Sequence, residues 1–163
     1  DFRAHEKTFQ LLTQVAGRAG RTSKRGKVLI QSFNPHHEIL QQVTQHDYKG
    51  MSKEQWYQRE IYKYPPYNKL IKITLKHKDY NKLNQAAEWY AKGLRNLFPV
   101  GVLGPEFPAV ARIRNLYLKN ILLKIPVEIS IQATKKALSR LERSFEAIPA
   151  YKGVRLIFVV DPY

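Results

Sequence analysis

The sequence contains no cysteine, only one methionine and no long apolar run. The absence of cysteine excludes disulfide bonds and thiolate metal sites, and it fits a reducing compartment. No apolar stretch approaches the roughly 20 residues that a membrane-spanning helix requires. The sequence therefore predicts a packed protein that has no membrane partner.

Acidic residues are also scarce. Asp and Glu number 13 against 28 Lys and Arg, which gives the 163-residue chain a formal net charge of +15. A basic excess of this size favours a polyanionic partner, above all nucleic acid, although a merely soluble basic protein is the alternative. The hydrophobic fraction of 44% is high enough for a packed core and argues against intrinsic disorder.

Constellations typical of hydrolases and metal proteins are missing as well. His36 and His37 are neighbours and cannot face one ligand from a regular element, while His5, His46 and His77 are scattered. A metal site needs ligands that converge at fixed spacing, so we expect none here. No Ser-His-Asp grouping or close pair of carboxylates indicates hydrolytic catalysis.

The N-terminal part predicts helices around one short strand. Residues 5–16 have the spacing of an amphipathic helix, and Gly17 and Gly20 are expected to end it. Residues 27–33 are mostly apolar and predict a strand that is buried on both faces. The apolar positions that should face the core from the first helix are Phe9, Leu12, Val15 and Ala16.

Two further helices are expected before the middle of the chain. Residues 36–46 predict a short helix, and residues 52–62 predict a second one. Ser52 with Gln55 three positions later has the spacing of a capping box, which places the start of the second helix at Ser52. Its charged outer face is expected to carry Trp56, Arg59, Glu60 and Lys63.

The run Tyr64-Pro65-Pro66-Tyr67 ends that helix, because the residue before a proline avoids the helical region. This run is the clearest domain boundary in the sequence. It divides the chain into a first part, residues 1–64, and a second part, residues 65–163.

The second part has the order strand, helix, strand, strand, helix, strand. This order is typical of the split βαβ, ferredoxin-like arrangement, an α+β fold in which both helices cover one face of an antiparallel sheet. Pro105 is expected to close the second strand. Strands are predicted at residues 69–76, 100–104, 116–125 and 154–160, and helices at residues 81–97 and 130–148. The apolar stripes of the helices are Leu83, Ala87, Tyr90, Leu94 and Leu97 in the first, and Ile131, Thr134, Leu138, Leu141 and Phe145 in the second.

Gln14, Gly17, Arg18, Gly20 and Arg21 form the pattern Gln-x-x-Gly-Arg-x-Gly-Arg at the end of the first predicted helix. Arginine offers fixed N–H donors and a permanent charge that suit a phosphate, and glycine allows a close approach of the backbone. Gln14 stands one helical turn before Arg18 and could direct its amide to the same place. This is chemistry for stabilising a transferring phosphoryl group. A helix end capped by Gly17 and followed by solvated arginines is the alternative.

The string QVAGRAGR resembles the sixth motif of superfamily 2 helicases, and Asp1-Phe2-Arg3-Ala4 resembles one branch of them. That branch is the PriA family of bacterial replication-restart helicases, primosomal protein N′. The resemblance continues through Tyr64-Pro65-Pro66-Tyr67, Leu103-Gly104-Pro105 and Asp161-Pro162-Tyr163, so it covers essentially the whole chain. It implies the tail of a RecA-like lobe in the first part and the family's C-terminal domain in the second. A chain that begins inside a motif is expected to be a C-terminal piece.

The resemblance implies a parent protein that uses ATP and Mg to unwind DNA from 3′ to 5′. Arg18 and Arg21 would be catalytic, and Gln14, Gly17 and Gly20 would contact the nucleotide. The family's phosphate-binding loop and its zinc-binding cysteines are expected upstream, so this piece alone should bind no cofactor and be inactive. The implied partners are forked, single-stranded and duplex DNA, single-stranded-DNA-binding protein and other primosome proteins in the bacterial cytoplasm.

The loop at residues 107–117 and the start of the next strand carry Arg112, Arg114 and Lys119. The family's C-terminal domain resembles a small-subunit ribosomal protein whose corresponding hairpin reaches into RNA. The resemblance therefore makes these three residues the predicted nucleic-acid contacts, and a solvated hairpin tip is the alternative. Family members often carry Tyr-Arg after this loop, whereas Tyr117 is followed here by leucine and then Lys119.

Two other functions are open to this sequence. One is a non-catalytic nucleic-acid-binding module of ribosomal type, and the other is a superfamily 2 translocase that is unrelated to replication restart. The Gln-x-x-Gly-Arg-x-Gly-Arg pattern argues against the first as the native role. The ferredoxin-like pattern and the Pro-Pro boundary argue against the second.

Overall fold

A computed structural model describes residues 2–19 and 26–162 of the chain. These residues divide into two compact units, one that extends to Tyr62 and one from Lys63 to Pro162. We describe each unit by itself. No helix in the described ranges is long and apolar enough to cross a membrane.

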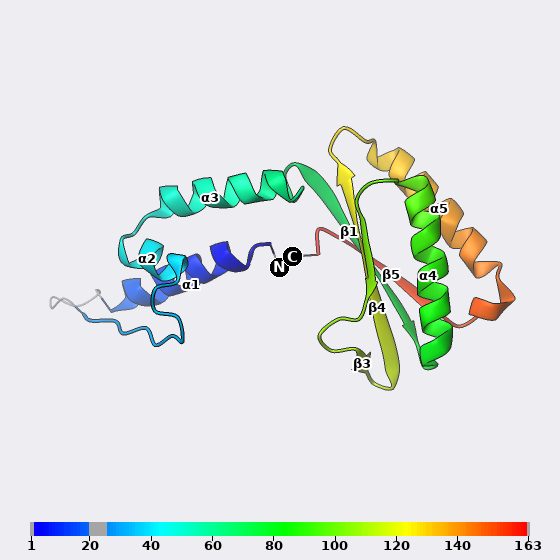
Figure 1. The fold of residues 1–163 in the computed structure, drawn as a ribbon, viewed down its shortest axis with the longest axis horizontal. Helices are drawn as coiled ribbons and strands as arrows, with labels where there is room; N and C mark the ends of the chain where they lie inside the picture. The colour runs from blue at the N-terminus through cyan, green and yellow to red at the C-terminus, as the bar shows by residue number, and fades with distance from the viewer. Residues whose placement is uncertain (1, 20–25, 163) are drawn as a thin grey trace. The chain divides into compact units, whose positions relative to one another are not determined.

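The N-terminal unit is helical in the part that the structure describes (Figure 1). Its helices are α1 (Ala4–Arg18), α2 (Glu38–Thr44) and α3 (Tyr48–Ile61). They enclose a small core because each contributes an apolar side chain that is less than 9% exposed. The buried core residues are Phe9, Ile39, Val43 and Met51, with Leu12 and Leu40 packed against them.

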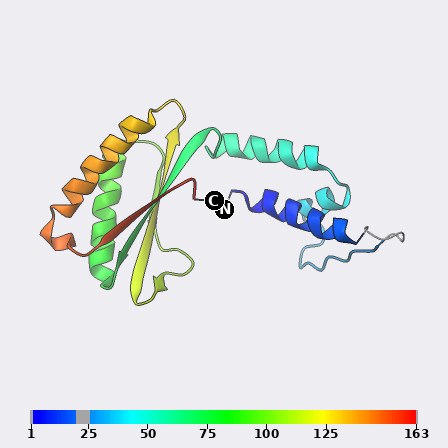
Figure 2. The ribbon, with the colours of Figure 1, turned by 180° about the vertical axis from the view of Figure 1, so that it is seen from behind.

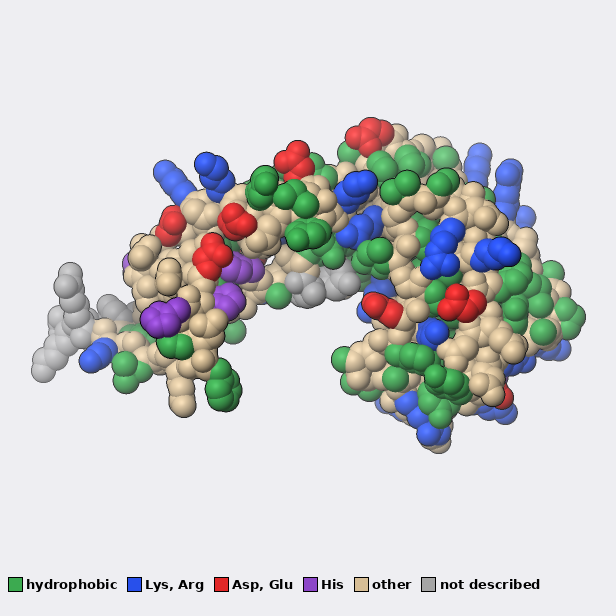
Figure 3. Space-filling model, in the orientation of Figure 1, with side chains coloured by type: hydrophobic (Ala, Val, Ile, Leu, Met, Phe, Trp, Pro, Cys, Tyr) green, Lys and Arg blue, Asp and Glu red, His purple; other side chains and the backbone are tan. Residues whose placement is uncertain are grey.

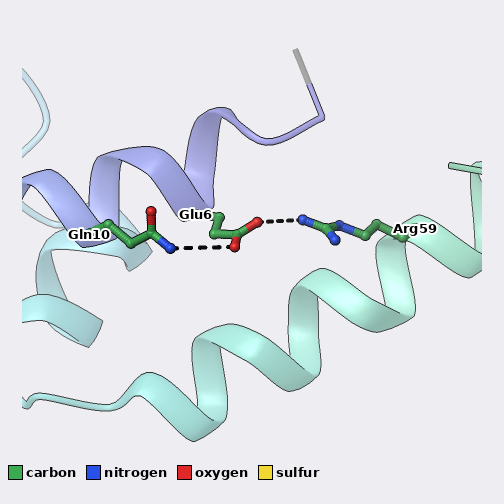
Figure 4. Close-up of polar contacts among 3 residues, drawn as sticks. All are labelled: Glu6, Gln10 and Arg59. Atoms are coloured by element: carbon green, nitrogen blue, oxygen red, sulfur yellow. Dashed lines mark hydrogen bonds and ion pairs between the residues drawn. The ribbon is translucent and has the colours of Figure 1, made fainter. Parts of the chain in front are cut away.

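An ion pair joins the first and third helices of this unit. The Arg59 guanidinium of α3 donates to the Glu6 carboxylate of α1 with an Nη2–Oε2 distance of 2.6 Å, and Gln10 donates to the other carboxylate oxygen (Figure 4). Arg59 also lies over the ring of Phe2, 5.2 Å from its centroid. The expectation that Arg59 belongs to a solvated outer face is therefore wrong, because its charge is used between helices.

The predicted strand at residues 27–33 is not formed. Its residues have neither helical nor strand structure, and the side chains of Leu29 and Phe33 are 84% and 111% exposed. A strand needs a neighbour that supplies backbone hydrogen bonds. None of the described residues of this unit forms a strand, so the apolar run lies open to solvent.

Helix α3 begins earlier than its sequence signal indicates. Asp47 caps it, and the Asp47 carboxylate accepts a hydrogen bond of 2.8 Å from the Gly50 N–H. Ser52 therefore lies inside the helix, and the capping box predicted for it is wrong. An aspartate at the N-cap supplies the same acceptor with a full charge at the positive end of the helix.

The C-terminal unit confirms the predicted α+β class with an antiparallel sheet. Its sheet has the order β2-β4-β1-β5, and the extra strand β3 pairs with β4. This is the connectivity of a split βαβ fold in which a fourth strand returns to the far edge. The strands are β1 (Asn68–His77), β2 (Val102–Glu106), β3 (Arg112–Ile113), β4 (Leu116–Pro126) and β5 (Arg155–Val160), and the long helices are α4 (Tyr80–Leu97) and α5 (Ile131–Glu146), followed by the short 3-10 helix η1 (Pro149–Tyr151).

Both long helices lie on the same face of the sheet (Figure 1, and from behind in Figure 2). They approach each other closely at Gly93 of α4, where an added Cβ would lie 2.5 Å from a methyl group of Leu141 in α5. The core between helices and sheet is fully buried at its centre. It contains Ile73 and Leu75 of β1, Ile121 and Leu123 of β4, Leu83, Tyr90 and Leu94 of α4, and Leu138, Leu141 and Phe145 of α5.

The predicted stripes are correct at their centres and wrong at their ends. Leu97 and Ile131 are 44% and 53% exposed, although each was expected to face the core. These residues lie at the ends of their elements, where the opposing layer no longer covers them. Pro105 lies inside β2 instead of closing it, which is tolerated because β2 is an edge strand.

Candidate nucleic-acid interface

The Gln-x-x-Gly-Arg-x-Gly-Arg pattern lies at the C-terminal end of α1. Gln14 and Arg18 are both exposed and stand one turn apart, so their side chains share one face of the helix. The structure therefore brings together two of the five predicted nucleotide residues on an accessible surface. Gly20 and Arg21 lie outside the described residues.

Gly17 does not end α1, contrary to the expectation from its sequence position. The helix continues to Arg18, and the N–H of the capping residue Ala19 donates to the Ala16 carbonyl at 3.2 Å. A Cβ added at Gly17 would meet no atom within 4 Å, so the glycine leaves open space beside Arg18. Arg18 in the last turn also complements the negative end of the helix dipole.

The second candidate site is the hairpin that β3 forms with β4. Arg112 and Ile113 pair with Tyr117 and Leu116, and the turn between them is Arg114-Asn115. Both turn residues have left-handed backbone angles, with φ of 47° and 63°. Such angles at both central positions match the twist of a two-residue hairpin, and asparagine tolerates them well.

The two hairpin arginines are exposed and differently held. The Arg112 guanidinium lies over the Tyr117 ring, 5.0 Å from its centroid, and donates to the Asn115 side chain at 3.2 Å. Arg114 is exposed at the turn itself. Figure 3 shows Lys and Arg side chains gathered at this end of the C-terminal unit. The hairpin therefore presents two exposed guanidinium groups, of which that of Arg112 is preorganised.

Lys119 is placed differently from the two arginines. It is only 9% exposed, and its Nζ lies 4.8 Å from the centroid of the Phe107 ring. In the register of the sheet it faces Leu75, on the helix-covered face. Its charge is therefore directed at an aromatic face beneath the hairpin.

An aromatic cluster supports the base of the hairpin, and the sequence patterns do not indicate it. Tyr80, at the start of α4, stacks on Phe107 with a centroid distance of 5.5 Å and an interplanar angle of 6°. The same Tyr80 ring meets Tyr117 edge-on at 5.5 Å. Arg112 and Lys119 thus each lie over a ring that Tyr80 contacts, which helps to hold these two cations in place. Only the fold brings these three distant rings together.

A lysine–tyrosine contact lies further along the sheet. The Lys124 Nζ lies 3.7 Å from the centroid of the Tyr64 ring. Burial, and to a lesser degree the nearby charge of Lys63, lowers the pKa of Lys124.

The described residues contain no group of three or more His, Asp or Glu side chains placed to hold a metal ion.

The chain matches the family model described as primosomal protein N C-terminal domain over residues 60–163. It is similar to the replication restart protein PriA of Bacillus subtilis, with 37% identity over 166 residues that cover 100% of this chain and 20% of that protein. The corresponding PriA of Synechocystis is 36% identical over 99% of this chain and 19% of its own length. That of Haemophilus influenzae is 33% identical over 99% of this chain and 22% of its own length. The chain therefore spans about a fifth of the length of these relatives.

Proposed function

This chain belongs to the PriA family of replication restart proteins, and from that membership we propose that it is part of an ATP-dependent 3′–5′ DNA helicase. The parent would recognise abandoned replication forks and assemble a primosome there. In this proposal the N-terminal unit supplies part of the ATP site and the C-terminal unit supplies a surface for DNA. The name of these relatives, replication restart protein, supports the restart role.

The catalytic part of the proposal rests on Arg18 and Arg21. Arginine side chains that reach the γ-phosphate neutralise charge in the transition state and are worth about 10³–10⁵ in rate. The exposed position of Arg18, one turn from Gln14 on the same helix face, supports this role. ATP and Mg would be bound by the parent with the family's upstream motifs, and zinc would be held upstream as well.

The DNA-binding part rests on one observation, the exposed hairpin arginines of a strongly basic chain. Arg112 and Arg114 stand at the tip of a short β-ribbon, and the net charge of the chain is +15. Contacts of this kind reach phosphates and carry no sequence information. We assign Lys119 a supporting role beneath the ribbon, because its Nζ is directed at the Phe107 ring.

The proposed protein partners are single-stranded-DNA-binding protein and other primosome proteins.

A second candidate function is a non-catalytic nucleic-acid-binding module. One observation favours it for the isolated piece: the C-terminal unit has a buried core of its own that is drawn from sheet and helices. Such a module would bind DNA without any dependence on nucleotide.

A salt titration tests the DNA-binding role. The 163-residue chain is titrated against labelled forked DNA at several salt concentrations, together with the variant R112A/R114A. We expect log affinity to fall linearly with log salt, and the variant to flatten that slope by up to two contacts at about 0.9 each on duplex. The control K135A/K136A removes the same charge from exposed positions of α5. Equal slopes for R112A/R114A and wild type would show that the hairpin arginines do not contact DNA and would favour a contact with a protein partner instead.

A further inference from the structure

The helices of the C-terminal unit cover only one face of its sheet. Lys72, Thr74 and Lys76 alternate with the core residues of β1 and therefore lie on the opposite face. In the described part of this unit no helix covers that face (Figures 1 and 2). Ile157 and Val159 of β5 belong to the same face and are 39% and 42% exposed.

The uncovered face forms a groove beneath the loop that leads to β3. A cavity of about 560 Å³ lies between the strands and this loop. Its floor carries Lys72, Lys76 and the hydrogen-bonded pair Thr74–Asn120, with an oxygen–oxygen distance of 2.9 Å. Its walls are aliphatic, and none of its described lining residues is acidic. The aliphatic lining includes Val110, Ile113, Leu118, Ile157 and Val159.

Two cations face each other directly at the end of this groove. Lys76 of β1 and Arg155 of β5 are register partners in the antiparallel pair, so their side chains lie on the same face. Neither has an ion-pair partner among the described residues. Like charges directly opposite each other destabilise a sheet. An external anion between them would remove that penalty.

The cation pair opens onto a second, strongly basic cavity. This cavity has about 550 Å³ and is lined by Lys76, Lys78, Lys82, Lys152 and Arg155, with His77 at its base. The carboxylate in its wall belongs to Asp79, which already accepts the Lys82 N–H at 2.8 Å as the N-cap of α4. One carboxylate can offset at most one of the five cations, so the cavity keeps an excess of positive charge. Lys76 lines both cavities, so they adjoin at this residue.

We propose that this surface binds a single strand of nucleic acid. We call it the basic track and define it as Lys72, Lys76, Lys78, Lys82, Lys152 and Arg155. The phosphates lie along the second cavity, and unpaired bases lie against the aliphatic walls of the groove. The proposal rests on the DNA-binding role proposed above. It adds the type of strand that is bound and a second binding surface, to which the hairpin arginines do not belong.

The chemistry of the groove selects a single strand over a duplex. A duplex presents phosphates outward and keeps the faces of its bases stacked inside, so aliphatic walls offer it little. A single strand exposes both its charged backbone and its bases, which matches a basic floor beside apolar walls. Leu116, at the start of β4 beside the hairpin, also lines the basic cavity, so the track continues the interface that the hairpin begins.

The test measures binding of the 163-residue chain to labelled oligothymidylate and to a labelled duplex at several salt concentrations. The variant K78A/K82A/K152A removes three cations of the track and no core residue. We expect its single-strand slope to fall by up to about 2, because each contact with a single strand is worth about 0.7. The duplex slope should change much less. The control K135A/K136A/R140A removes the same charge from exposed positions of α5 and should leave the single-strand slope unchanged.

A second variant tests the aliphatic walls. V110S/I113S changes two exposed wall residues and no charge, so it should weaken oligothymidylate binding and keep the salt slope. Circular dichroism and urea unfolding verify that each variant is folded. An unchanged single-strand slope in K78A/K82A/K152A, with R112A/R114A still impaired, overturns the track and leaves the proposed function intact. Equal losses on both substrates overturn the single-strand assignment. A wild-type chain that binds neither substrate overturns the DNA-binding role and the track together.

Discussion

Glu6 and Arg59 meet between α1 and α3, with 2.6 Å between carboxylate and guanidinium (Figure 4). Their side chains are 32% and 15% exposed, which places the pair between a surface and a buried salt bridge. Glu6 lies in the first turn of α1 and Arg59 in the last turn of α3. The contact therefore joins the two helices at the end of α3 that is far from the loop between α2 and α3. Because the apolar core of this unit is small, we expect the ion pair to contribute to its stability.

The first prediction concerns this ion pair. Replacing Glu6 by glutamine should lower the local stability of the N-terminal unit by about 1 kcal/mol, because a half-buried pair contributes more than an exposed one. Hydrogen exchange of the amides in α1 and α3 measures it. Glu60 is an exposed glutamate on α3, so Glu60→Gln is the matched control and should change little. Equal amide protection in Glu6→Gln and Glu60→Gln would show that the ion pair does not stabilise the unit.

The second prediction concerns Tyr90 of α4. Its side chain is fully buried, meets Phe145 edge-on at 5.4 Å, and its hydroxyl has no hydrogen-bond partner in the described structure. An unsatisfied buried hydroxyl costs about 1–3 kcal/mol. Tyr90→Phe should therefore raise the urea midpoint, whereas Tyr57→Phe at an exposed site should not. A lower midpoint for Tyr90→Phe would indicate that the hydroxyl is stabilising.

Tyr90 also predicts a pH dependence. Burial, and secondarily the charge of Glu142, raises the pKa of Tyr90. A raised pKa means that the folded state holds its proton more tightly than the unfolded state. The free energy of unfolding is therefore at its full value, as far as this group is concerned, below the unfolded pKa of about 10. It falls as the pH rises above that value. Above that pH, the urea midpoint should fall less steeply with rising pH in Tyr90→Phe than in the wild type. An equally steep fall in both proteins would contradict this.

The third prediction concerns ATP. The 163-residue chain should not hydrolyse ATP, with or without DNA, because its sequence contains no glycine-rich phosphate loop with a following lysine. A phosphate-release assay with the purified chain measures this. The full-length parent is the positive control. Turnover that is stimulated by DNA in the chain alone would require a different ATP site from the one proposed.

The fourth prediction concerns the two motif arginines in the full-length parent. Arg21→Ala should reduce DNA-stimulated ATP hydrolysis by about 10³-fold or more and leave DNA binding largely intact, and Arg18→Ala should also be severe. Lysine at either position should rescue poorly, because a point charge lacks the two-pronged geometry of a guanidinium. Lys7→Ala, on an exposed position of the same helix, is the control. Near-normal hydrolysis in Arg21→Ala would show that the motif does not act on phosphate.

Local periodicity was sufficient to predict most of the C-terminal unit. In β1 the apolar residues at 71, 73 and 75 alternate with polar ones, which indicates the buried face of the strand. The apolar stripes of α4 and α5 indicate theirs, because both periods follow from backbone geometry alone. The order of these elements then left the split βαβ topology as the consistent arrangement. The motif residues Gln14 and Arg18 were likewise predictable, since their one-turn spacing requires only that α1 be helical.

Tertiary structure decided what depends on neighbours that are distant in the chain. Residues 27–33 have a strand-like composition, yet a strand exists only where another strand supplies hydrogen bonds. The sequence groups Lys119 with the two arginines of the loop, but the register of β4 places its side chain on the helix-covered face of the sheet, beside Phe107. Lys76 and Arg155 become partners only through the pairing of β1 with β5. A sequence specifies which face of each element is apolar, but the charges that meet across a sheet depend on strand order and register, which are set by packing of the whole unit.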